Sequence, residues 1–89
     1  MKLLITKSAR QFGYIIWNSK NKDDIEKILG GKTEISVILN GFDLGVKPID
    51  WKYHRISIGY KFTRALPANA HFYYIEVKNG ILEVTTKNA

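Results

Sequence analysis

Three basic side chains gather in one short stretch, "HRISIGYKFTRAL", which spans residues 54–66. Arg55, Lys61 and Arg64 lie within ten residues of one another, and the alternation over 55–58 predicts a half-buried strand that leads into a short basic helix. An arginine can hold a phosphate or a guanine edge with two hydrogen bonds, whereas a lysine supplies a point charge. The stretch therefore indicates a surface for a polyanion, of which nucleic acid is the commonest.

The positive charge of the chain is concentrated in two stretches. The net charge is +6 over 89 residues; residues 1–22 hold five basic and no acidic side chains, and 47–64 hold five basic and one acidic. A fold that brings these stretches together would create one positive face. We expect eight residues of this face to contact duplex DNA: Lys7, Arg10, Lys20, Lys22, Lys52, Arg55, Lys61 and Arg64. Ordinary solvated charge without such a partner is the alternative.

Aromatic residues are interleaved with the basic ones, and they leave two further interpretations open. If exposed, residues such as Trp51 and Tyr53 would stack on the bases of a single strand, as in an OB-like or SH3-like nucleic-acid module. Packing in the core is the other use of such side chains. A non-catalytic protein-interaction module with an incidental basic face is the second alternative to duplex binding.

Catalytic and metal-binding patterns are missing from the sequence. His54 and His71 are the only histidines, there is no cysteine, and neither histidine has a partner at ligand or triad spacing. No glycine-rich segment precedes a Lys-Ser or Lys-Thr pair. We therefore expect neither an enzyme nor a bound cofactor or metal. The lack of cysteine and of a long apolar run predicts a cytoplasmic protein that does not enter a membrane.

Short apolar segments separated by turn residues predict a mostly β fold with one or two short helices. Strands are expected near residues 3–7 and 14–17, with a connection over 8–13, and near 48–55 and 56–60. A helix capped by Asn21 is expected over 22–29, and a short basic one before Pro67. Asn-Gly pairs at 40–41 and 79–80 predict tight hairpin turns, because both central residues of such a turn take positive φ.

The order of these elements predicts one domain, residues 1–89, made of two repeats over 1–45 and 46–89. Aligning residues 14–17 with 55–58 gives an offset of 41, and aligning the two Asn-Gly turns gives 39. Each repeat would consist of two strands, a helix and two further strands, in that order. Both basic stretches then occupy the opening part of a repeat.

The second half resembles the AbrB/MazE-like swapped-hairpin family of DNA-binding transcription factors. In "HRISIGYKFTRALPANAHFYYIEVKNGILEV", Arg55 stands at the family's motif arginine, His54 and Gly59 replace its usual glycine and proline, and Lys61 and Arg64 fall in its short helix. The first half matches less closely, with Gly13 at the glycine and Tyr14 in place of the arginine. The two matches together cover almost the whole chain.

The resemblance implies a fold and a function. Members of the family are usually homodimers whose interleaved hairpins form a small β-barrel, so two copies in one chain imply a pseudo-dimer that folds as a monomer. The family grips DNA with basic residues of its N-terminal strands and loops. The resemblance therefore implies a DNA-binding transcriptional regulator or a small nucleoid-associated protein. The chain ends soon after its last strand, without the toxin-binding tail of MazE-like antitoxins, so a toxin-neutralising role is not expected.

Overall fold

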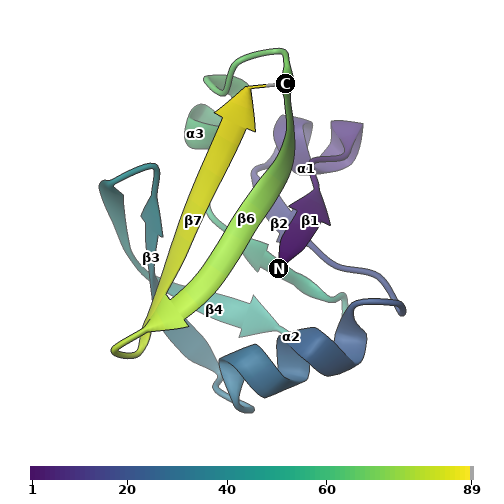
Figure 1. The fold of residues 1–89 in the computed structure, drawn as a ribbon, viewed down its shortest axis with the longest axis vertical. Coiled ribbons are helices and arrows are strands. Elements are labelled where there is room, and N and C mark those ends of the chain that lie inside the picture. The colour runs from purple at the N-terminus through teal and green to yellow at the C-terminus, as the bar shows by residue number, and fades with distance from the viewer. Residues whose placement is uncertain (89) are drawn as a thin grey trace.

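The computed structural model describes residues 1–88, which form a mostly β domain (Figure 1). The elements follow in the order β1 (Lys2–Leu4), α1 (Lys7–Phe12), β2 (Tyr14–Ile16), α2 (Lys22–Leu29), β3 (Glu34–Leu39), β4 (Phe42–Asp50), β5 (Arg55–Ser57), α3 (Tyr60–Arg64), β6 (Ala70–Lys78) and β7 (Ile81–Asn88). Within the described residues the strands form a seven-stranded, nearly closed sheet in the order β1-β6-β7-β3-β4-β5-β2. The mostly β, barrel-like fold expected from the sequence is confirmed.

Two hairpins build most of this sheet. β3 pairs antiparallel with β4 through the turn at Asn40 (φ 49°) and Gly41 (φ 83°), and β6 pairs with β7 through Asn79 (φ 52°) and Gly80 (φ 76°). The hairpins join where β3 runs parallel to β7. Both predicted Asn-Gly turns are therefore confirmed, since all four central residues take the positive φ that such a turn requires.

The number of helices differs from the expectation of one or two, because residues 1–88 contain three. The unexpected helix is α1, which replaces part of the connection expected over 8–13. The Thr6 hydroxyl caps its start by accepting a hydrogen bond from the Ala9 amide at 3.0 Å, and Gly13 ends it with φ 81°. α1 packs beside α3 at the same end of the molecule (Figure 1).

The helix predicted over 22–29 is confirmed as α2. It buries Ile25 and Leu29, and Asp23 and Asp24 occupy its first turn, where the helix dipole favours negative charge. Asn21 is the N-cap residue of this helix, as predicted, but its side chain makes no capping hydrogen bond.

Residues 51–54 are a turn rather than the end of a strand. β4 stops at Asp50, whose carboxylate accepts a hydrogen bond from the Tyr53 amide at 2.9 Å, and His54 takes φ 57° before β5 begins. This correction matters for the site because it places Trp51, Lys52 and Tyr53 in an exposed turn beside the β2–β5 pair. Local side-chain bonding by Asp50 ends the strand in a way that alternation does not reveal.

The core lies inside the sheet and is apolar. Alternate residues of the short strands point inward, so that Leu3, Ile15 and Ile56 are almost fully buried while their neighbours face outward. Among the described residues, no buried side-chain nitrogen or oxygen lacks a hydrogen-bond partner. None of the helices in residues 1–88 is both long enough and apolar enough to cross a bilayer.

The two expected repeats do not divide the elements evenly. β1, α1, β2, α2 and β3 lie within residues 1–45, and β5, α3, β6 and β7 lie within 46–88, while β4 (Phe42–Asp50) spans the boundary between them. The segments that the sequence alignment set side by side, 14–17 and 55–58, lie in strands that pair with each other, with Ile15 opposite Ile56.

Candidate nucleic-acid interface

The antiparallel pair of β2 and β5 forms a short ribbon, and the candidate site lies on its outer surface. Ile15 and Ile56 are opposite one another and point into the core. The alternation of a strand therefore turns their neighbours outward. These outward residues are Tyr14, Ile16, Arg55 and Ser57.

Five side chains on and beside this ribbon form a continuous series of aromatic and cationic contacts, here called the aromatic–basic face: Phe12, Tyr14, Lys52, Tyr53 and Arg55. The Arg55 guanidinium carbon lies 4.4 Å from the Tyr14 ring centre and 5.0 Å from the Tyr53 ring centre. The Lys52 ammonium lies 5.4 Å from the Tyr53 ring, and the Phe12 ring lies 6.1 Å from that of Tyr14. All four distances are in the range of attractive cation–π or aromatic contacts.

Both ends of the aromatic–basic face are open to solvent. Phe12 is 53% exposed and Tyr53 is 57% exposed. A shallow groove of about 560 Å³ runs alongside, lined by residues that include Tyr14, Trp51, Lys52 and Arg55. The face therefore offers flat ring surfaces and positive charge to the same ligand.

Asp50 holds Arg55 in place without enclosing it. The Asp50 carboxylate lies 3.9 Å from Nε of Arg55, and both side chains remain more than a third exposed. An ion pair this exposed contributes little to stability, at most about 1 kcal/mol. Its effect is on orientation, because the carboxylate at Nε and the two ring contacts together favour one position of the guanidinium.

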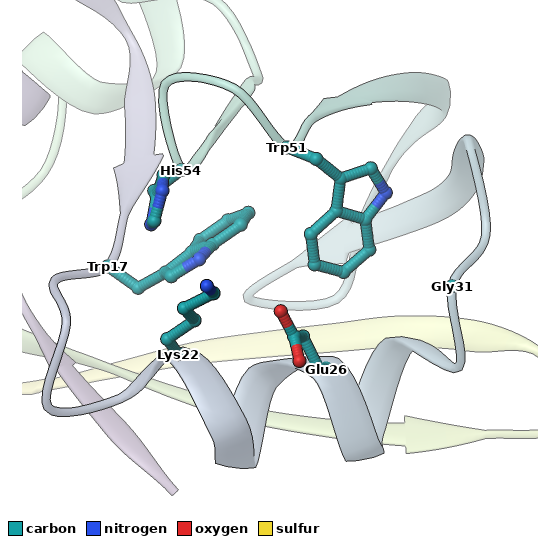
Figure 2. A pocket seen from close by; sticks show the side chains of 6 residues that line it. All are labelled: Trp17, Lys22, Glu26, Gly31, Trp51 and His54. Carbon is teal, nitrogen blue, oxygen red and sulfur yellow. The ribbon is translucent and has the colours of Figure 1, made fainter.

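Next to this face is a hollow of about 480 Å³ walled by two indoles, here called the tryptophan hollow; its lining residues are Trp17, Lys22, Glu26, Gly31, Trp51 and His54 (Figure 2). The rings of Trp17 and Trp51 meet edge to face with their centres 5.9 Å apart, and the His54 ring lies 6.3 Å from Trp17. The side chains of Lys22 and Glu26 rise from α2 toward the indoles (Figure 2).

Backbone hydrogen bonds fix the two walls of the tryptophan hollow. The Trp17 amide donates to the His54 carbonyl at 3.0 Å, which ties the end of β2 to the turn before β5. The indole Nε1–H of Trp51 donates to the Lys32 carbonyl at 2.8 Å, which directs that ring across the segment after α2. The hollow is therefore preformed by the fold and combines apolar walls with one ammonium and one carboxylate at its edge.

The predicted contact residues fall into separate places. Lys52 and Arg55 belong to the aromatic–basic face, Lys22 lines the tryptophan hollow, and Lys20 is exposed in the connection before α2. Three others lie on the neighbouring helices α1 and α3, where all are exposed: Lys7, Lys61 and Arg64. The guanidinium of Arg64 stacks on the Tyr60 ring at 4.7 Å, and its Nε donates to the Gln11 carbonyl at 3.1 Å.

Arg10 has a structural task in this fold. Its guanidinium donates to the carbonyls of Leu66 at 2.8 Å, Pro67 at 3.2 Å and Ala70 at 2.9 Å. These bonds attach α1 to the connection between α3 and β6, more than fifty residues away. The half-buried Arg10 therefore has fewer N–H groups left for a ligand than the exposed Lys7 on the same helix.

Sequence reasoning singled out Trp51 and Tyr53 among the aromatic residues, but it did not identify Trp17, Glu26 or His54 as parts of a site. His54 has no partner at ligand or triad spacing in the sequence. Nothing local in the sequence signals the contact between Trp17 and Trp51, which arises from the pairing of β2 with β5. The described residues contain no group of three or more histidine or acidic side chains arranged to hold a metal ion.

Comparison with known proteins adds no relative to this description. No protein-family model, curated protein or solved structure matches the chain.

Proposed function

We propose that the chain binds nucleic acid through the aromatic–basic face and the adjoining tryptophan hollow. The observation that carries this proposal is the contact of Arg55 with the rings of both Tyr14 and Tyr53, beside a hollow walled by Trp17 and Trp51. Positive charge and stacking surfaces side by side are the two requirements for holding a nucleotide chain.

The phosphates would be held by cations of this surface. The Arg55 guanidinium is in contact with two rings and remains partly exposed, and a guanidinium edge matches a phosphate well. Lys52 adds charge beside Tyr53, and Lys22 adds charge at the hollow. The net charge of +6 would raise the rate of encounter with any polyanion.

The bases would use the rings. A base can stack on the outer surface of Tyr53, and the tryptophan hollow, at about 480 Å³, has room for a base against its apolar lining. Such a base would lie in the hollow between the indoles and α2, where Lys22 offers a hydrogen-bond donor and Glu26 an acceptor for polar groups on its edge. Only an unpaired base presents both its faces and its edges, so single-stranded nucleic acid is the form that this geometry favours.

Duplex DNA is the second candidate ligand, and the basic residues on helices α1 and α3 support it. Lys7, Lys61 and Arg64 are exposed on the adjacent helices α1 and α3, where they can meet a phosphate backbone without any unpaired base. The resemblance to the AbrB/MazE-like family supports the same use, with the chain as a swapped-hairpin pseudo-dimer and a transcriptional regulator.

A binding assay on two forms of one sequence tests the proposal. A labelled single strand of about twelve nucleotides and the matching duplex are titrated at several salt concentrations. We expect the single strand to bind more tightly, with an affinity that falls steeply as salt rises. Arg55→Ala should weaken binding about tenfold or more, whereas Lys78→Ala, which removes an equal charge from the β6–β7 hairpin, should change it little.

The contrast between these variants decides the outcome. Equal losses for Arg55→Ala and Lys78→Ala would mean that only the overall charge matters, and the proposed surface would be wrong. Tighter binding of the duplex, with losses at Lys61 and Arg64, would favour the second candidate instead.

A further inference from the structure

A second strand pair repeats the backbone pairing of the β2–β5 ribbon. β1 pairs antiparallel with β6 so that Lys2, Leu3 and Leu4 face Tyr74, Tyr73 and Phe72. β5 pairs with β2 so that Arg55, Ile56 and Ser57 face Ile16, Ile15 and Tyr14. Adding 53 to the residue numbers of β1 gives those of β5, and adding 58 to the residue numbers of β2 gives 72–74 of β6. Each of the three residue pairs in one ribbon then corresponds to a pair in the other.

The hydrogen bonds that flank the two ribbons obey the same correspondence. The Ile5 amide donates to the His71 carbonyl at 2.8 Å, and its counterpart Ile58 donates to Gly13 at 2.7 Å. At the other end, the Ile75 amide donates to Met1 at 2.9 Å, and the Trp17 amide donates to His54 at 3.0 Å. The four flanking hydrogen bonds and the six residue pairs therefore support the same correspondence between the β1–β6 and β2–β5 ribbons.

The helices complete the relationship. α1 begins three residues after β1 ends, and α3 begins three residues after β5 ends. Equivalent helical residues meet one another: the Thr63 hydroxyl donates to the Arg10 carbonyl at 2.7 Å, and Arg64 Nε donates to the Gln11 carbonyl at 3.1 Å. Residues that contact their own counterparts lie next to a local two-fold axis, which therefore passes between α1 and α3.

Residues 1–17 and 54–75 are thus two copies of one strand–helix–strand unit that exchange their strands. The first strand of each copy pairs with the last strand of the other. This correspondence differs from the alignment of 14–17 with 55–58 that the sequence alone favours. Burial agrees with it, since the inward positions of both copies are filled by buried residues: Leu3 and Ile56, Ile5 and Ile58, Ile15 and Tyr73, Trp17 and Ile75.

The outer surface of the β1–β6 ribbon reproduces the cation–ring pair of the β2–β5 ribbon. Lys2 is the counterpart of Arg55, and Phe72 is the counterpart of Tyr14. The Lys2 ammonium lies 4.5 Å from the Phe72 ring centre, compared with 4.4 Å for the guanidinium carbon of Arg55 and the Tyr14 ring. A second ring follows on this ribbon, because Tyr74 lies 6.5 Å from Phe72.

We propose that the outer face of the β1–β6 ribbon, formed by Lys2, Phe72 and Tyr74, is a second nucleic-acid contact equivalent to the one at Arg55 and Tyr14. The inference rests on the proposed function of the first face. Lys2 supplies charge for a phosphate, and the Phe72 and Tyr74 rings supply stacking surface for bases. One long strand can then engage both faces, which raises its affinity above that of a strand that reaches only one.

Nuclear magnetic resonance can observe the two ribbons separately. An isotope-labelled chain is titrated with an oligothymidylate of about four nucleotides, which is too short to require both faces. We expect amide shifts on β1 and β6 as well as on β2 and β5. The double variant Lys2→Gln, Phe72→Leu should lose the shifts on β1 and β6 and keep those on β2 and β5.

The affinity for a strand of about sixteen nucleotides provides the second measurement. The double variant should lose about tenfold, and Lys2→Gln alone, a change at an exposed side chain that leaves the core untouched, should lose part of this. Shifts confined to β2 and β5, with unchanged affinity of both variants for the long strand, would overturn the second contact and leave the proposed function standing. Absence of any shift or binding would overturn both.

Discussion

Gly13 and Gly59 meet backbone to backbone where the end of α1 touches the start of α3. The Gly13 carbonyl accepts hydrogen bonds from the amides of Ile58 at 2.7 Å and Gly59 at 3.2 Å. A Cβ added to Gly13 would overlap the backbone of Gly59 and Tyr60. This contact brings the two helices together and sets the position of the β2–β5 ribbon between them.

Gly13→Ala should therefore destabilise the fold strongly. Gly13 has φ 81°, where a side chain costs roughly 1–2 kcal/mol, and the overlap with backbone adds about 1–3 kcal/mol. Gly30→Ala is the matched control, since Gly30 also ends a helix with positive φ but has open space around it. Urea denaturation should show a clearly larger loss for Gly13→Ala. Equal losses would mean that the helices can separate at no cost.

Arg10→Ala should lower the free energy of unfolding by about 1–3 kcal/mol, because three carbonyls of the 66–70 connection lose a charged hydrogen-bond donor. Lys7→Ala, on the same helix but exposed, should change it by less than about 0.5 kcal/mol. The measurement is denaturant unfolding of both variants. If Arg10→Ala is as stable as Lys7→Ala, the three bonds do not hold the connection.

We expect the fold to lose stability in alkaline solution because of the buried phenol of Tyr73. Burial raises the pKa of the Tyr73 phenol to about 12, while the nearby charge of Arg10 acts in the opposite direction. In the unfolded chain the Tyr73 phenol has its ordinary pKa near 10. Between pH 10 and 12 this phenol therefore binds fewer protons in the unfolded chain than in the folded one. Stability from this group is therefore complete below pH 10 and falls as the pH rises to about 12, by up to roughly 3 kcal/mol.

The variant Tyr73→Phe isolates this effect from the titration of the lysines. It should unfold with a weaker pH dependence between 10 and 12 than the unchanged chain. The hydrogen bond from the Tyr73 hydroxyl to the Tyr14 carbonyl is long, at 3.3 Å, so its loss should cost only about 1 kcal/mol at neutral pH. Identical pH profiles of the two proteins would contradict the assignment.

Tyr53→Ala should weaken binding of single-stranded nucleic acid by roughly 1–3 kcal/mol if a base stacks on the ring. Phe42→Ala is the control, because Phe42 is equally exposed, at 62%, but lies at the tip of the β3–β4 hairpin against Phe62. Fluorescence anisotropy of a labelled oligonucleotide measures both. A comparable loss for Phe42→Ala would show that the surface of contact lies elsewhere.

In dilute solution the chain should be a monomer. Residues 1–88 complete a nearly closed sheet within one chain, with both members of each strand pair present. Light scattering should then give a mass near 10.2 kDa that does not change on dilution. A dimer that loses its fold on dilution would mean that the chain supplies only part of a larger sheet.

Local features were predictable from the sequence because they depend on neighbouring residues. The Asn-Gly turns follow from the positive φ that these residues tolerate, and the helix over 22–29 follows from its spacing and its terminal glycines. The mostly β fold and the inward alternation of Ile56 and Ile58 follow from strand geometry. α1 was missed although Thr6 and Gly13 mark its ends, because a helix of six residues is not stable alone and forms here by packing against α3.

The arrangement of the candidate site was decided by the tertiary structure. Arg55 contacts Tyr14 only because β2 pairs with β5, and no local pattern specifies which short strands pair. The same pairing brings Trp17 to Trp51, and the fold places the Arg10 guanidinium against the carbonyls of Leu66 and Ala70, which the sequence did not indicate. The sequence determined which charges and rings the chain carries. Contacts between residues more than thirty positions apart depend on the whole fold, and these contacts decided which of the side chains come together in the candidate site.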